Sequence, residues 1–136
     1  MKSTLVNLLL DVAKRHAQES YAEKLKVGAV LVRDGRVITG GYNGMPTGFD
    51  NVCEDENGET LDEVMHAEVN VIGYAAAKGI ATEGCTIVIT HVPCFRCAKI
   101  ILGARIKEVY YEQEFQQTAS LDFLKKAGIK VIKVES

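Results

Sequence analysis

The alternation of strands and helices in the second half of the chain is the strongest constraint on its fold. Short runs rich in β-branched residues predict strands at 86–90, 108–111 and 129–134, and helical periodicity predicts helices at 95–103 and 119–126. Each helix lies between two strands, and a helical connection of this kind joins parallel strands. This half of the chain therefore predicts a parallel sheet of the α/β class.

The first half adds an antiparallel hairpin and two further helices. Apolar spacing predicts a helix over residues 5–20, and a strand at 27–32 is followed by the turn Arg33-Asp34-Gly35-Arg36 and a second strand at 37–38. Residues 40–62 are rich in Gly, Asn, Asp and Glu and predict a long irregular loop. A helix over 65–77 follows, ended by Lys78-Gly79. We expect one domain over residues 1–136, a three-layer α-β-α sandwich with a mixed five-stranded sheet and helices on both faces.

Charge and composition narrow the class of ligand. The formal net charge of −2 argues against a protein that binds nucleic acid through a broad basic face, but it permits a small phosphorylated ligand. No apolar run approaches the ~20 residues of a membrane span. We therefore expect a cytoplasmic protein that binds neither membranes nor nucleic acid, with its four cysteines reduced.

Cys94 and Cys97 form a Cys-x-x-Cys motif between a predicted strand and a predicted helix. A turn at this place directs both sulfurs to one point, and the free N–H groups of the helix N-terminus favour the thiolate form. The motif indicates a metal site. A thioredoxin-like redox pair and two buried structural thiols are the alternatives.

Two cysteines leave a catalytic zinc site one protein ligand short, and His66 is the natural third ligand. His16 falls on a predicted surface helix, where we expect a solvated side chain. His91 stands close before the cysteine motif, where packing or hydrogen bonding is the expected role, although the sequence leaves it open as a ligand.

Glu68 lies two residues after His66, at the start of a predicted helix, where both side chains can face one pocket. Zn²⁺ with two thiolates and a neutral imidazole is formally neutral, so a bound water can lose a proton near neutral pH. Glu68 is then free to take that proton. The alternative role is a first-turn carboxylate that interacts favourably with the helix dipole.

The combination of His66-Ala67-Glu68 with Pro93-Cys94-Phe95-Arg96-Cys97 resembles the cytidine and deoxycytidylate deaminase superfamily. Within it, the chain is similar to the short viral and bacterial deoxycytidylate (dCMP) deaminases from about residue 5 to residue 134. The loop Tyr-Asn-Gly-Met-Pro-Thr-Gly at 42–48, together with residues 27–29 and 66–70, carries this closer resemblance.

The resemblance implies an enzyme that hydrolyses dCMP to dUMP and ammonia and so supplies dUMP for dTMP synthesis. It implies one zinc per subunit, held by His66, Cys94 and Cys97, and a water that attacks C4 of cytosine. Glu68 would carry a proton from this water to N3 and then protonate the departing amino group. The remaining cysteines, at positions 53 and 85, are expected to be bystanders.

The resemblance also implies substrate contacts. The expected partners are the base edge for Ala67 and Pro93, the sugar for Asn43, the phosphate for Lys24 and Lys26, and a position closing over the substrate for Phe115. Exposed surface charge is the alternative for the two lysines, and core packing for Phe115.

For the assembly, the resemblance implies a homohexamer activated by dCTP and inhibited by dTTP, with Mg²⁺ accompanying a bound triphosphate. Asn70 and Tyr74 match helix positions near the subunit contacts and the effector region, but Ala77 stands where some viral relatives have Arg.

Other functions compatible with the motif differ in substrate or in chemistry. The substrate could be a base in tRNA or single-stranded DNA, but the acidic balance and the absence of Trp disfavour it. The site could also belong to a zinc-folded or nucleotide-sensing module without catalysis. Within the nucleotides, the sequence separates dCMP only weakly from dCTP or from methylated or hydroxymethylated forms.

Overall fold

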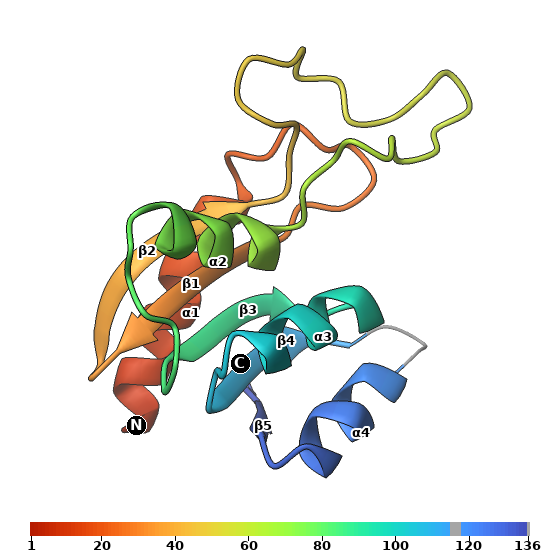
Figure 1. Ribbon diagram of the computed structural model, residues 1–136. Helices are drawn as coiled ribbons and strands as arrows, with labels where there is room; N and C mark the ends of the chain where they lie inside the picture. Colours follow the sequence, from red (N-terminus) through yellow and green to blue (C-terminus); the bar gives the residue numbers. More distant parts are fainter. Residues whose placement is uncertain (115–117, 136) are drawn as a thin grey trace.

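The computed structural model describes residues 1–114 and 118–135 and forms one five-stranded sheet with four helices (Figure 1). The elements follow one another as α1 (Ser3–Ala17), β1 (Gly28–Arg33), β2 (Arg36–Tyr42), α2 (Ala67–Ala77), β3 (Thr86–His91), α3 (Phe95–Gly103), β4 (Glu108–Gln113), α4 (Ala119–Lys126) and β5 (Lys130–Lys133). None of the helices in these ranges is long and apolar enough to cross a membrane.

The sheet is mixed, in the order β2-β1-β3-β4-β5. β1 pairs antiparallel with both β2 and β3, whereas β3, β4 and β5 are parallel. The hairpin turns on Asp34 and Gly35, whose φ angles of 52° and 74° are the left-handed values that a two-residue hairpin turn requires. The predicted hairpin and parallel half are both confirmed.

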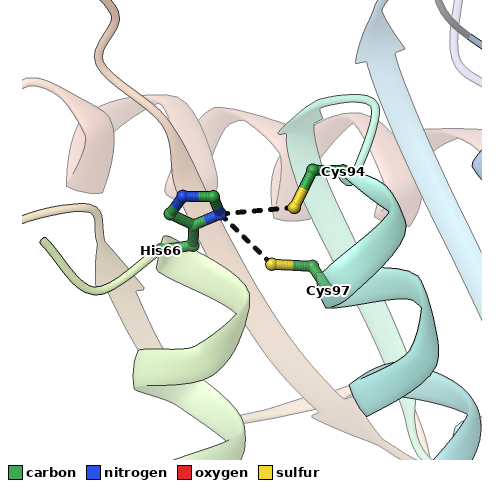
Figure 2. A group of neighbouring side chains, drawn as sticks. All are labelled: His66, Cys94 and Cys97. Atoms are coloured by element: carbon green, nitrogen blue, oxygen red, sulfur yellow. Dashed lines mark hydrogen bonds between the residues drawn. The ribbon is translucent and has the colours of Figure 1, made fainter. Parts of the chain in front are cut away.

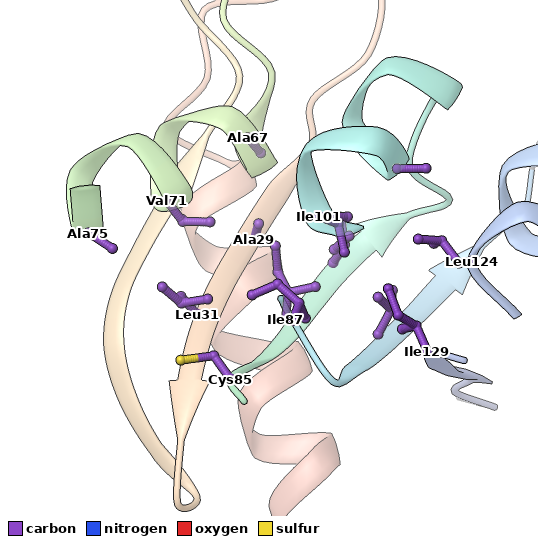
Figure 3. Close-up of a cluster of buried hydrophobic side chains, with 14 residues drawn as sticks. Ala29, Leu31, Ala67, Val71, Ala75, Cys85, Ile87, Ile101, Leu124 and Ile129 are labelled. Atoms are coloured by element: carbon purple, nitrogen blue, oxygen red, sulfur yellow. The ribbon is translucent and has the colours of Figure 1, made fainter. Parts of the chain in front are cut away.

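Helices cover both faces of the sheet, as the sequence predicts. In β1, Ala29 and Leu31 pack toward α2 and α3, and Val30 and Val32 pack toward α1, because successive side chains of a strand point to opposite faces. Figure 3 shows the larger core, in which α2, α3 and α4 close over one face of the strands. The three layers are therefore α1, the sheet, and the α2–α3–α4 layer, and the latter carries His66, Glu68, Cys94 and Cys97.

Two expectations about the first half were wrong. The loop was expected to begin at Gly40, but β2 continues to Tyr42. Gly40 and Gly41 are strand residues with close neighbours: a Cβ on Gly40 would meet the His16 ring, and one on Gly41 would lie 3.3 Å from Val71 Cγ1. The same packing half-buries His16, which was expected to be solvated.

The segment between β2 and α2 is a long loop closed at its base. Gly44 and Met65 form an isolated antiparallel bridge, and Glu54 and Thr60 form a second one farther out. Residues 53–61 thus make an arm, which reaches beyond the sheet at the top of Figure 1. This arm forms one wall of the cavity described below.

Candidate active site

The N-termini of α2 and α3 bring the motif residues together. His66 is the N-cap of α2 and Cys94 the N-cap of α3, both with extended backbone and neither with a side-chain capping hydrogen bond. Their side chains are therefore free to leave the helix ends and face each other. Cys97 lies in the first turn of α3, so its sulfur points to the same place as that of Cys94.

The three side chains have the spacing of a zinc site (Figure 2). Nδ1 of His66 lies 3.5 Å from Cys94 Sγ and 3.3 Å from Cys97 Sγ. All three ligand atoms lie within 4.8 Å of one another. Tetrahedral zinc with usual Zn–N and Zn–S bonds places N and S ~3.6 Å apart. The donor set therefore fits Zn²⁺, and His66 would bind through Nδ1.

His66, Cys94 and Cys97 shift one another's pKa values. Hydrogen bonds from Cys97 and His66 lower the pKa of Cys94 to about 3. The hydrogen bond with Cys94 raises the pKa of His66, and the same thiolate raises the pKa of Cys97. Cys94 is thus a thiolate at neutral pH. A metal ion deprotonates a coordinating thiol, so binding would release the Cys97 proton.

Glu68 is the buried acid beside the triad. It lies in the first turn of α2, is only 3% exposed and lines the same cavity as His66. Burial raises its pKa to about 7, so its carboxyl can both accept and donate a proton near neutral pH. The expectation that His66 and Glu68 face one pocket is confirmed.

His66, Cys94 and Glu68 line a cavity of about 540 Å³. This volume lies in the usual range for small-molecule sites. The cavity is lined by Ala22, Lys24, Leu25, Val27, Asn43, Cys53, Glu54, Thr60, Val64, His66, Ala67, Glu68, His91, Val92, Pro93, Cys94, Phe95, Ala119 and Ser120. A nucleotide-sized ligand could thus reach both the metal ligands and the buried acid.

Asn43 lines the cavity, but its amide already holds the backbone before β1. Its Oδ1 accepts a hydrogen bond from Val27 N–H at 2.8 Å, and its Nδ2 donates to the Leu25 carbonyl at 2.8 Å. The two expected phosphate partners are placed differently. Lys24 lines the cavity, whereas Lys26 is exposed and does not line it.

The residues expected at the base edge, Ala67 and Pro93, both line the cavity. The Pro93 carbonyl accepts a hydrogen bond from the buried Ser120 hydroxyl at 2.7 Å, which ties the turn before α3 to α4. This contact fixes the backbone immediately before Cys94.

The remaining expected residues lie elsewhere. Asn70 donates from Nδ2 to the Tyr42 carbonyl at 2.6 Å and so joins α2 to β2. Tyr74 is 43% exposed, with Lys78 Nζ 5.8 Å from its ring centroid. Phe115, expected to close over the substrate, lies outside the described residues.

His91 and the other two cysteines do not belong to the triad. His91 lines the cavity, with Nδ1 2.7 Å from Thr90 Oγ1, and burial lowers its pKa. Cys53 is buried in the cavity wall, and Cys85 lies in the core with its Sγ 3.8 Å from the Ala81 carbonyl. Within the described ranges, the metal-type cluster is the one formed by the three motif residues.

Several lining residues were not singled out from the sequence: Glu54, Thr60, Val64 and Ser120. The first three come from the loop, where no periodicity indicates which side chains face inward. Ser120 carries a weak signal, since it is a polar residue on the inner face of α4 between apolar neighbours.

Comparisons with known proteins agree with this geometry. A model of the cytidine and deoxycytidylate deaminase zinc-binding region matches residues 3–113. ComE operon protein 2 of Bacillus subtilis is 39% identical over 124 residues, covering 88% of this chain; this chain spans 65% of the length of that relative. Deoxycytidylate deaminase of Enterobacteria phage T4 is 31% identical over 177 aligned positions, covering 98% of this chain and 90% of the relative.

Among solved structures, dCMP deaminase from the cyanophage S-TIM5, in complex with dCMP and dUMP, superposes with a TM-score of 0.94. The two chains are 36% identical, and the match covers 98% of each. The family model spans most of the chain and includes His66, Glu68, Cys94 and Cys97. The chain therefore belongs to the cytidine and deoxycytidylate deaminase family.

Proposed function

We propose that this protein catalyses the hydrolytic deamination of dCMP to dUMP with release of ammonia. The observation that carries the proposal is the cluster of His66, Cys94 and Cys97 beside a cavity that His66, Cys94 and the buried acid Glu68 line. The similarity over 98% of both chains to a structure in complex with dCMP and dUMP supports this substrate.

His66, Cys94 and Cys97 would hold one Zn²⁺ per subunit. When bound, zinc supplies Lewis acidity that lowers the pKa of a water molecule toward neutrality. These residues lie at the N-termini of α2 and α3, where His66 and Cys94 line the cavity and Cys97 is buried in the first turn of α3.

Glu68 would move the protons of the reaction. Its carboxylate takes a proton from the water that attacks C4 and delivers it to N3 of the ring. Glu68 then transfers the second proton of this oxygen to the exocyclic amino group, the C4–N bond breaks, and ammonia leaves as the C4 carbonyl forms. A pKa of about 7 suits a group that must gain and lose a proton in each cycle.

Other residues would position the nucleotide. We propose that the backbone at Ala67 and Pro93 contacts the base edge and that Asn43, whose amide also anchors residues 25–27, contacts the sugar. Lys24 would attract the phosphate, and Lys26 would add positive charge from outside the cavity. We propose that Phe115 closes over the substrate.

We further propose that residues 1–136 act as one domain in a cytoplasmic homohexamer, supplying dUMP for dTMP synthesis. dCTP with Mg²⁺ would activate the enzyme and dTTP would inhibit it. The exposed ring of Tyr74 supports a role for it at a subunit contact, next to Asn70. Light scattering coupled to gel filtration, and rates with and without each triphosphate, test these points.

The direct test is to incubate zinc-loaded protein with dCMP and measure ammonia and dUMP. We expect stoichiometric formation of both products, with deoxycytidine-containing oligonucleotides turned over far more slowly. Absence of dCMP turnover, with or without dCTP and Mg²⁺, would overturn the proposal.

A further inference from the structure

Glu54 places a carboxylate in the wall of the active-site cavity, on the arm formed by residues 53–61. Its Oε2 accepts hydrogen bonds from two consecutive backbone N–H groups, those of Glu23 at 3.1 Å and Lys24 at 3.2 Å. These bonds fix the carboxylate next to the chain segment that precedes β1. Glu54 is therefore half-buried and held in the cavity wall by these two bonds.

The same part of the wall holds the positive charge available to a substrate phosphate. Among residues 1–114 and 118–135, Lys24 is the one Lys or Arg that lines the cavity. Its ammonium lies 3.9 Å from Glu59 Oε2, and both side chains are exposed, so the pair is weak and leaves Lys24 open to a phosphate. The fixed Glu54 carboxylate is bonded to the backbone of this same lysine.

The orientation of a nucleotide follows from the position of the metal ligands. C4 of the base must lie at the triad and Glu68, so the 5′ end points away from them, toward the cation. Phosphates beyond the first must then continue past Lys24 along the arm, which carries Glu54, Asp55, Glu56 and Glu59. One phosphate meets one ammonium, whereas two or three bring added negative charge against these carboxylates.

We propose that Glu54 is a specificity-determining residue that limits the substrate to nucleoside monophosphates. The inference rests on the proposed deamination of a cytosine nucleotide and adds the residue that selects its phosphate number. Glu54 acts by charge, because a fixed carboxylate repels each added phosphate. Its hydrogen bonds to the backbone keep that charge in place.

The test compares kcat/KM for dCMP, dCDP and dCTP, with the deaminated nucleotides separated by chromatography. The wild-type protein should show a kcat/KM that falls with each added phosphate. Glu54→Gln keeps an oxygen that accepts both N–H bonds but removes the charge. It should reduce the preference for dCMP over dCTP by about tenfold or more.

Two variants are matched controls. Glu63→Gln removes the same charge from an exposed residue of the loop between β2 and α2 that lies outside the arm and does not line this cavity, and should leave the preference unchanged within about threefold. Glu54→Asp keeps the charge and should retain most of the preference, even where the shorter side chain lowers activity on all three substrates.

Several results would overturn the proposal: an unchanged preference in Glu54→Gln, an equal loss of preference in Glu63→Gln, or a loss in Glu54→Asp as large as in Glu54→Gln. A wild-type protein that deaminates dCTP as efficiently as dCMP overturns it without any variant. Lack of wild-type turnover of all three nucleotides would instead refute the deaminase function, and the selection by Glu54 with it.

Discussion

Glu68 is buried beside three potential metal ligands but is not one of them. Its role in proton transfer can therefore be tested separately from metal binding. Its side chain is buried, while the ligand atoms belong to His66, Cys94 and Cys97. A change at Glu68 can thus remove the proton carrier and leave the ligand set intact.

We predict that Glu68→Gln lowers kcat by at least about 10²-fold, because an amide cannot take the proton from water. The side chain keeps its volume and loses a charge that is costly to bury, so folding should be unimpaired. Rates of ammonia release, zinc content by mass spectrometry and circular dichroism check this. Loss of zinc together with activity would contradict the assigned role.

His91 gives a prediction about pH. Burial lowers its pKa in the folded protein below the unfolded value, so between these two values the unfolded state binds the extra proton. The free energy of unfolding should therefore fall as pH decreases below about 6.5. In metal-free protein, denaturant titrations from about pH 7.5 to about pH 5.5 should show a smaller decrease for His91→Gln than for wild type. Parallel curves would contradict this.

At the scale of elements, glycine is required where the backbones of a helix and a strand come too close for a side chain. A Cβ on Gly28, at the start of β1, would collide with the Ala13 carbonyl of α1 and come within 2.8 Å of Ala17 N. Gly73, in α2, has nothing within 4 Å of its Cβ position. The two glycines thus differ in what they contribute to the fold.

We predict that Gly28→Ala destabilises the protein by at least about 2 kcal/mol, because α1 must move away from β1. Gly73→Ala should stabilise it by about 0.5–1 kcal/mol, since alanine is the better helix former. Urea unfolding of both variants is the measurement. Equal effects of the two substitutions would show that the α1–β1 contact is not the cause.

The elements that could be predicted from sequence are those with strong local signals. The bounds of α3 and α4 agree with the expected ranges 95–103 and 119–126. The length of β2 was underestimated because Gly40 and Gly41 look like loop residues in the local sequence. Their place in a strand depends on packing against His16 and Val71, which lie far away in the sequence.

The metal ligands could be predicted because zinc binding requires particular residue types at a particular spacing. Glu54 and Ser120 were not predicted, because their roles depend on contacts with residues 27 to 31 positions away in the sequence.

At the scale of the whole molecule, a bound metal would join two separate helices. His66 belongs to the N-terminus of α2, and Cys94 and Cys97 belong to α3. The ion would therefore connect parts of the α2–α3–α4 layer that follow different strands, and its binding energy would add to folding stability.

We predict that a chelator lowers the Tm of the wild-type protein by roughly 5 °C or more and that added Zn²⁺ restores it. Cys97→Ala should not respond to either treatment. Cys85→Ala removes another buried cysteine, one in the core away from the triad, and should respond like wild type. Calorimetry measures all three proteins. A chelator effect in Cys97→Ala would place the stabilising metal elsewhere.

The bridge between Gly44 and Met65 has a consequence for how this architecture tolerates variation in length. Because the two ends of the segment are paired, residues added between them enlarge the arm without separating β2 from α2, and the entropic cost of a longer loop grows slowly. The alignment with the T4 relative spans 177 positions although this chain has 136 residues. We therefore expect residues inserted within the arm to leave the start of α2, with His66 and Glu68, in its place.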